Sequence, residues 1–130
     1  MQPKRVLIID DEEDIREIAM MSFELVNWDV LSAATGRAGV TVAAATPVDV
    51  ILLDVMMPEL DGPGTVALLN ADERTRSIPV IFLTAKVQGS DRRRYQELGV
   101  QGLIAKPFDP VMLPFRVVEI LRGTTVEPPF

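Results

Sequence analysis

Four apolar segments of this sequence each end in residues that could take part in chemistry: Asp10 and Asp11, Asp54, Thr84, and Lys106. The chain contains no histidine and no cysteine. Histidine or thiolate metal sites, a Ser-His-Asp triad and a disulfide framework are therefore excluded. Any chemistry must come from carboxylates, hydroxyls, amines, guanidinium groups and the backbone.

The three aspartates need a cation if the fold brings them together. Two unit charges about 4 Å apart repel by about 4 kcal/mol at an intermediate effective dielectric. Because all the candidate ligands are oxygen atoms, a hard cation such as Mg²⁺ or Mn²⁺ is favoured. Mg²⁺ typically uses one or two carboxylates, keeps several waters and leaves positions for phosphate oxygens.

The acidic run continues beyond Asp11 with Glu12, Glu13 and Asp14. Negative charges are favoured in the first turn of a helix because they interact well with the helix dipole. We therefore interpret these three residues as solvated charges at a helix start rather than as metal ligands.

The elements that must position the polar residues are predicted from hydrophobic spacing and from helix breakers. Short apolar runs rich in branched residues, typical of strands buried on both faces, predict strands over residues 6–9, 28–34, 48–53, 78–85 and 103–105. Helical spacing and capping signals predict helices over residues 14–26, 37–45, 64–71, 90–98 and 110–121. For the last helix, Asp109 is the expected N-cap and Pro110 the first helical residue.

Strands that alternate with helices through short connections predict an α/β fold, in which helices cover both faces of a parallel sheet. Ligands of such sheets bind outside the carboxyl ends of the strands, at the switch point in strand order. The polar residues at the strand ends are therefore expected along one edge of the sheet.

The length of 130 residues fits a single domain. We expect this domain to span residues 1–122 and residues 123–130 to form a flexible tail.

A net charge of −6 argues against direct binding of nucleic acid. No apolar run reaches the ~18 residues needed to span a bilayer, and the N-terminus lacks a signal peptide. We therefore expect a cytoplasmic protein without membrane insertion.

Four segments together resemble the receiver domain of two-component response regulators: VLIIDDEEDI, VDVILLDVMMPELDG, IPVIFLTA and GLIAKPFDP. Each short motif is common by itself, but the four in this order at strand ends are specific. The resemblance covers residues 5–121, nearly the whole chain. It implies a CheY-like, flavodoxin-like doubly wound (βα)5 fold with a five-stranded parallel sheet in the order 2-1-3-4-5.

The resemblance also assigns a metal site. It implies that Asp11, Asp54 and the backbone carbonyl of Met56 bind Mg²⁺, with Mn²⁺ as a possible replacement. Asp10 would help to position the metal through its water shell.

By the same resemblance, Asp54 is the phosphoacceptor, which takes a phosphoryl group from the phosphohistidine of a sensor histidine kinase. A carboxylate can form an aspartyl phosphate when the charge of the transferring group is neutralised. Lys106 would pair with the phosphoryl oxygens and Thr84 would hydrogen-bond one of them. The bond between Lys106 and Pro107 is expected to be cis, which is inexpensive only before proline.

The implied function is a phosphorylation-dependent switch that catalyses its own phosphorylation and slow dephosphorylation. Its partners would be a sensor histidine kinase or phosphotransfer protein and, downstream, a protein partner or a second copy bound through the face of the fourth helix, fifth strand and fifth helix. The run Arg92–Arg94 on the fourth helix is interpreted as a solvated face.

A pseudo-receiver that binds partners without phosphotransfer is the alternative. Hydrolysis of an external phosphoester is a third reading, but a second acid–base group is lacking.

The sequence departs from the family's pattern at four positions. Leu103 replaces the usual aromatic residue three positions before the lysine, so we expect only a small conformational switch. Met56 and Lys86 occupy the positions that tend to set the dephosphorylation rate; the apolar Met56 should give little help to an attacking water, and Lys86 could hinder or orient it. Pro114 lies where it would bend or delay the last helix.

Overall fold

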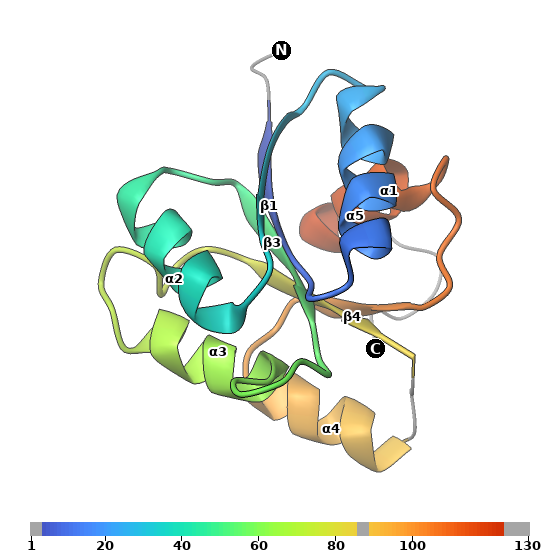
Figure 1. Cartoon of the computed structure of the whole chain (residues 1–130). Helices are drawn as coiled ribbons and strands as arrows, with labels where there is room; N and C mark the ends of the chain where they lie inside the picture. Colours follow the sequence, from blue (N-terminus) through green and yellow to red (C-terminus); the bar gives the residue numbers. More distant parts are fainter. Residues whose placement is uncertain (1–3, 86–88, 124–130) are drawn as a thin grey trace.

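Five parallel strands form the centre of the molecule and run in the order β2-β1-β3-β4-β5 (Figure 1). The computed structural model describes residues 4–85 and 89–123. The strands are β1 (Arg5–Ile9), β2 (Asp29–Ala33), β3 (Val50–Asp54), β4 (Val80–Thr84) and β5 (Gly102–Ala105). The predicted five-stranded sheet and its strand order are confirmed.

Five helices alternate with the strands and cover both faces of the sheet. They are α1 (Glu13–Glu24), α2 (Gly36–Ala45), α3 (Gly62–Asn70), α4 (Gly89–Glu97) and α5 (Leu113–Arg122). Figure 1 shows α1 and α5 on one side of the sheet and α2, α3 and α4 on the other. The predicted α/β architecture is therefore also confirmed.

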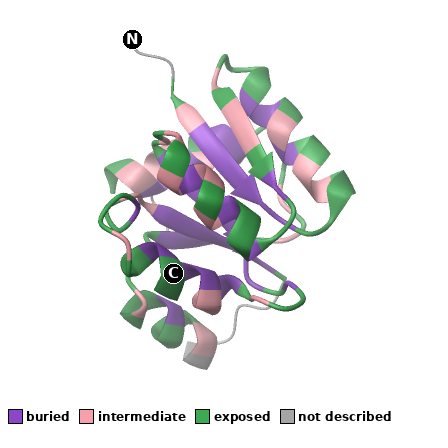
Figure 2. Cartoon of the chain, turned by 60° about the vertical axis from the view of Figure 1, so that its left-hand side comes forward, coloured by how far each residue is buried: buried purple, intermediate pink, exposed green. Residues whose placement is uncertain are grey.

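The central strands carry the core, and their side chains alternate between two hydrophobic clusters. From β1, Leu7 and Ile9 contribute to the cluster beneath α2, α3 and α4, whereas Val6 and Ile8 contribute to the cluster beneath α1 and α5. All four are fully buried, and Figure 2 shows the central strands as a continuous buried layer. Burial of each such side chain stabilises the folded state by about 1.5–3 kcal/mol. Because helices cover both faces of the sheet, both faces of these strands are apolar.

Most predicted boundaries are confirmed to within two residues. Two strands begin later than expected. β4 begins at Val80 because the preceding Pro79 has no N–H to donate to the ladder. β3 begins at Val50, directly after Asp49, whose carboxylate accepts a hydrogen bond of 2.7 Å from the backbone N–H of Arg5.

The last helix begins at Leu113 rather than at Pro110, so the prediction of Asp109 as its N-cap is wrong. The carboxylate of Asp109 instead accepts a hydrogen bond from the backbone N–H of Val111 at 3.0 Å, which forms a local turn. A helix starting at Pro110 would place Pro114 beyond its first turn, where proline lacks the needed N–H and its ring clashes with the preceding turn. In the observed helix Pro114 lies in the first turn, where no N–H is needed.

Two of the sequence expectations fall outside the described residues. Lys86 belongs to the gap at residues 86–88, and the expected tail lies almost entirely within residues 124–130. Among the residues that are described, no helix is both long and apolar enough to cross a membrane.

Candidate functional site

Acidic side chains meet at the carboxyl ends of the neighbouring strands β1 and β3. Asp10 follows β1 directly and Asp54 is the last residue of β3, and the two side chains are almost completely buried. The exposed Asp11 and Glu12 complete the group, and carboxylate oxygens of all four residues lie within 4.8 Å of one another. The structure therefore brings together the three predicted acidic residues. It also adds Glu12, which the sequence assigned only to a helix start.

One ammonium group lies among these acids. The Nζ atom of Lys106 is 2.7 Å from Oδ2 of Asp10, 3.2 Å from Oδ1 of Asp54 and 3.9 Å from Oε1 of Glu12. The loop after β5 brings the lysine here, and its backbone N–H donates to the carbonyl of Thr84 at 2.9 Å. The peptide bond between Lys106 and the following proline is cis, as the resemblance implied.

The protonation of Asp54 is governed by its burial. Burial, followed by the charge of Asp10, raises the pKa of Asp54 to about 6, although Lys106 and the N–H of Met56 act in the opposite direction. The pKa of Lys106 is also raised: burial alone would lower it, but the hydrogen bond and charge of Asp10, and then Asp54, outweigh that effect. The lysine thus stays charged and the nearby carboxyl holds its proton more tightly than usual.

The composition of the cluster fits a hard divalent cation. Four carboxylates and one ammonium group leave a surplus of negative charge in a partly buried site, and such a surplus is costly unless it is compensated. The donors are oxygen atoms, which suit Mg²⁺ or Mn²⁺. The exposed Met56 lies two residues beyond Asp54, and its N–H donates to Oδ1 of that residue at 3.3 Å. The role of its carbonyl as a ligand stays a prediction.

Thr84 ends β4 at the same edge of the sheet. It is 2% exposed and pairs in register with Ala105, the residue before Lys106. Thr84 thus lies at the strand end where the sequence predicted a hydroxyl group. Its contact with a phosphoryl group stays a prediction. On the same strand, Phe82 pairs with Leu103, which is 6% exposed and packs in the cluster beneath α4.

Sequence reasoning missed Arg16, in α1. Its Nη1 atom donates a hydrogen bond of 2.8 Å to the backbone carbonyl of Asp10. The spacing of six residues gave no signal for this contact, because the path of the chain between the strand and the helix sets it. The arginine therefore contacts the acidic cluster through the backbone.

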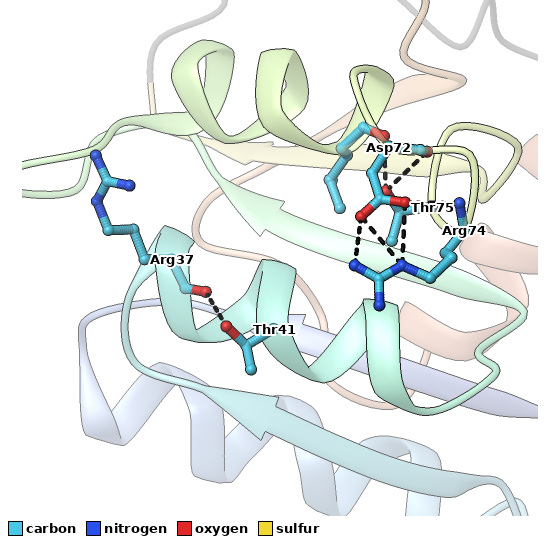
Figure 3. A network of polar contacts seen from close by, with 6 residues as sticks. Arg37, Thr41, Asp72, Arg74 and Thr75 are labelled. Atoms are coloured by element: carbon cyan, nitrogen blue, oxygen red, sulfur yellow. Dashed lines mark hydrogen bonds and ion pairs between the residues drawn. The ribbon is translucent and has the colours of Figure 1, made fainter.

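A second polar network lies away from these acids, at the end of α3 (Figure 3). The carboxylate of Asp72 accepts hydrogen bonds from Nε and Nη2 of Arg74, the latter at 2.7 Å. These bonds lower the pKa of Asp72 to about 2. The hydroxyl of the buried Thr75 donates to the carbonyl of Leu69 at 2.7 Å. The network holds the turn after α3.

The sequence matches a family model described as the response regulator receiver domain over residues 6–117. It is 38% identical over 122 residues to the probable transcriptional regulator ycf27 of Porphyridium aerugineum, covering 94% of this chain and 50% of the relative. It is 36% identical over 124 residues to the phosphate regulon transcriptional regulatory protein PhoB of Pseudomonas aeruginosa, covering 95% of this chain and 54% of the relative. The chain thus spans about half the length of these relatives.

Solved structures show the same similarity. The chemotaxis protein CheY4 of Vibrio cholerae superposes with a TM-score of 0.86 at 26% identity, covering 92% of this chain and 99% of that one. The receiver domain of the sensor histidine kinase PA1611 of Pseudomonas aeruginosa superposes with a TM-score of 0.81 at 27% identity, covering 94% of this chain and 99% of that one. The latter structure carries a magnesium ion in its active-site cleft.

Three observations indicate the same family: the strand order, the acidic cluster beside a lysine, and the family match. The cluster resembles the Mg²⁺ site of receiver domains. The match over residues 6–117 covers most of the 130-residue sequence. The chain therefore belongs to the family of response regulator receiver domains, the modules of two-component signalling.

Proposed function

We propose that this chain is a phosphorylation-dependent switch in which Asp54 accepts a phosphoryl group. The observation that carries the proposal is the placement of the Asp54 carboxylate, which is buried at the end of β3 and lies 3.2 Å from the ammonium of Lys106. A buried carboxylate beside a fixed positive charge is suited to attack an anionic phosphoryl group, because the lysine offsets the incoming charge.

The donor would be the phosphohistidine of a sensor histidine kinase or of a phosphotransfer protein. A carboxylate oxygen of Asp54 attacks the phosphorus atom, a P–O bond forms and the P–N bond to the imidazole breaks. The electron pair of the broken bond returns to the imidazole nitrogen. Lys106 would then pair with phosphoryl oxygens, and the hydroxyl of Thr84, at the end of the adjacent strand, would donate to one of them.

The reaction would depend on Mg²⁺, for which Mn²⁺ could substitute. Asp11, Asp54 and the backbone carbonyl of Met56 are the residues that would hold the ion, and Asp10 would act through its water shell. When bound, the ion would supply positive charge that offsets the carboxylates and the incoming phosphoryl group. The donor set of the acidic cluster supports this assignment.

Phosphorylation would change the local charge by about −1.5 to −2, and the rearranged site would alter the face formed by α4, β5 and α5. We propose that this face binds a downstream protein or a second copy of the chain. Arg92–Arg94 are exposed on α4 and could serve such a contact.

The decisive experiment is intact-mass measurement after incubation with a small phosphodonor and Mg²⁺. We expect the mass of the wild-type protein to increase by one phosphoryl group and the Asp54→Asn variant to stay unmodified. A second arm without Mg²⁺ should show little product. An unmodified wild type, or equal modification of the variant, would contradict the proposal, and an unmodified protein that still binds partners would indicate a pseudo-receiver.

A further inference from the structure

Arg16 makes a hydrogen bond to the backbone of a residue of the acidic cluster. Its Nη1 atom donates to the carbonyl oxygen of Asp10 at 2.8 Å, and its own backbone N–H donates to the carbonyl of Glu12 at 3.1 Å. We propose that Arg16 is a positioning residue, which fixes the segment from Asp10 to Glu12 in the form that binds the divalent cation. The inference rests on the proposed function, in which this segment supplies metal ligands.

Each of the four polar atoms of Asp10 has a hydrogen-bond partner of its own. Its backbone N–H donates to the carbonyl of Ala33 at 3.1 Å. Oδ1 accepts from the N–H of Glu12 at 2.9 Å, and Oδ2 accepts from Nζ of Lys106 at 2.7 Å. The carbonyl oxygen is the remaining polar atom, and the bond that anchors it comes from Arg16. Because Asp10 is fully buried, loss of this donor would leave the carbonyl without compensation for its lost hydration.

The anchored carbonyl also directs Asp11. The carbonyl of Asp10 and the nitrogen and Cα of Asp11 belong to one planar peptide unit. When Arg16 fixes the direction of that carbonyl, it fixes where the Cα of Asp11 lies and hence the origin of its side chain. The arginine thus links a fully buried acid to the exposed Asp11 of the same cluster.

The sign of the effect on metal affinity separates positioning from simple electrostatics. Arg16 carries a positive charge next to the acidic cluster, and this charge by itself disfavours a cation. If charge were its main contribution, removal of Arg16 would tighten the binding of Mg²⁺. If positioning dominates, removal weakens binding despite the lost repulsion.

The test compares the Mg²⁺ dissociation constants of Arg16→Gln, Arg16→Lys and wild type, measured by titration calorimetry with the metal ion alone. We expect Arg16→Gln to weaken binding about tenfold, as when a partner of a metal ligand is lost. Arg16→Lys keeps a donor and the charge, so its affinity should lie between the two. Arg5→Gln is the matched control, because Nη1 of Arg5 also donates to a carbonyl, that of Pro47 at 3.1 Å, at the opposite end of β1.

A second measurement reports on the contact itself in metal-free protein. The carbonyl carbon of Asp10 should shift in the NMR spectrum of Arg16→Gln, together with the amide of Asp11, and both shifts should be smaller in Arg16→Lys. If Arg16→Gln does not fold, the lysine variant still has to show weaker Mg²⁺ binding than wild type. Unchanged or tighter binding, or an equal loss in Arg5→Gln, would overturn the inference.

These outcomes are distinct from failure of the proposed function. A wild-type protein that binds Mg²⁺ without modification of Asp54 contradicts the phosphoacceptor role and leaves the role of Arg16 testable. A wild type that is phosphorylated, with unchanged Mg²⁺ affinity in Arg16→Gln, contradicts only the role of Arg16.

Discussion

The ammonium of Lys106 donates a hydrogen bond of 2.7 Å to the carboxylate of Asp10 across 96 residues of sequence. The side chain of Asp10 is fully buried and that of Lys106 is 12% exposed, so the pair joins the loop after β5 to the end of β1 in a largely buried position. Removal of one partner from a buried pair leaves an uncompensated charge, which costs far more than the pair itself contributes.

We therefore expect Lys106→Met to lower the free energy of unfolding by about 3–5 kcal/mol in metal-free buffer. Urea unfolding measures the change. The control is Arg74→Met, which breaks the exposed pair with Asp72 and should lower the free energy of unfolding far less, because exposed ion pairs contribute little. Equal losses in the two variants would show that the buried lysine has no special role. Added Mg²⁺ should recover part of the stability of Lys106→Met, because it replaces the missing positive charge.

The carboxyl of Asp54 should titrate near its raised pKa of about 6 in metal-free protein. Because this value lies above the ordinary 3.8, the folded state holds the proton more tightly than the unfolded state. The contribution of Asp54 to stability is thus fully present below pH 3.8 and lost as the pH rises through about 6. Carboxyl NMR follows the titration. Asp54→Asn should remove this part of the pH dependence of unfolding, and Mg²⁺ should lower the apparent pKa. A titration midpoint at or below 3.8 would contradict the expectation.

The contribution of Asp72 to stability should depend on pH in the opposite direction. The hydrogen bonds from Arg74 lower its pKa to about 2. Its contribution to stability is therefore present above the ordinary value of 3.8 and lost as the pH falls through about 2. Arg74→Gln should raise the pKa of Asp72 towards 3.8 in the same NMR experiment, while the titration of Asp54 stays unchanged. No movement of Asp72 would show that the hydrogen bonds do not persist in solution.

Gly62 should be intolerant of a side chain because α3 begins against the end of β3. A Cβ atom at this position would lie 2.9 Å from Cα of Val55 and 3.1 Å from the carbonyl oxygen of Asp54. We expect Gly62→Ala to lower stability by about 1–3 kcal/mol, as overpacking usually does, and to slow the modification of Asp54. Gly64→Ala is the control, since its nearest contact is the flexible end of Leu60. If Gly62→Ala leaves the free energy of unfolding unchanged, the backbone beside Asp54 can shift to accommodate a side chain, and the prediction is wrong.

Leu103 is expected to limit the amplitude of the conformational switch. Its side chain is buried beside Phe82, in the same cluster as Tyr95 of α4. A buried leucine has no ring or hydroxyl that could exchange between the interior and the surface. A phosphoryl mimic added with Mg²⁺ should therefore cause small amide shifts at Leu103 and its neighbours, and larger ones close to Asp54. Wide shifts around Leu103 would contradict this prediction.

The strand-end residues could be predicted because each follows a buried apolar run. A run such as Val6–Ile9 is typical of an inner strand, and the position of Asp10 at the edge of the sheet follows from that prediction. Lys106 could be placed by the same logic, although its contact with Asp10 depends on a loop whose path the sequence does not reveal.

The wrong N-cap prediction for the last helix arose because a local signal does not include the neighbouring geometry. The pair of Asp109 and Pro110 is a good helix start by itself, but a helix that began there would place Pro114 beyond its first turn, and the helix begins at Leu113 instead. Glu12 is an exposed charge at the start of α1, as the sequence predicted, and its carboxylate also joins the acidic cluster because the chain turns tightly after Asp10.

The order of the strands has a consequence for synthesis on the ribosome. β1 and β3 are neighbours in the sheet, so a nascent chain that has emerged only as far as β4 already has the segments that carry all four carboxylates of the cluster. Lys106 follows β5 and emerges later. Until then, the growing protein would hold those acids together without their own counter-charge, and cellular divalent cations would be the natural substitute. Assembly of the sheet edge would thus become sensitive to Mg²⁺ before the chain is complete.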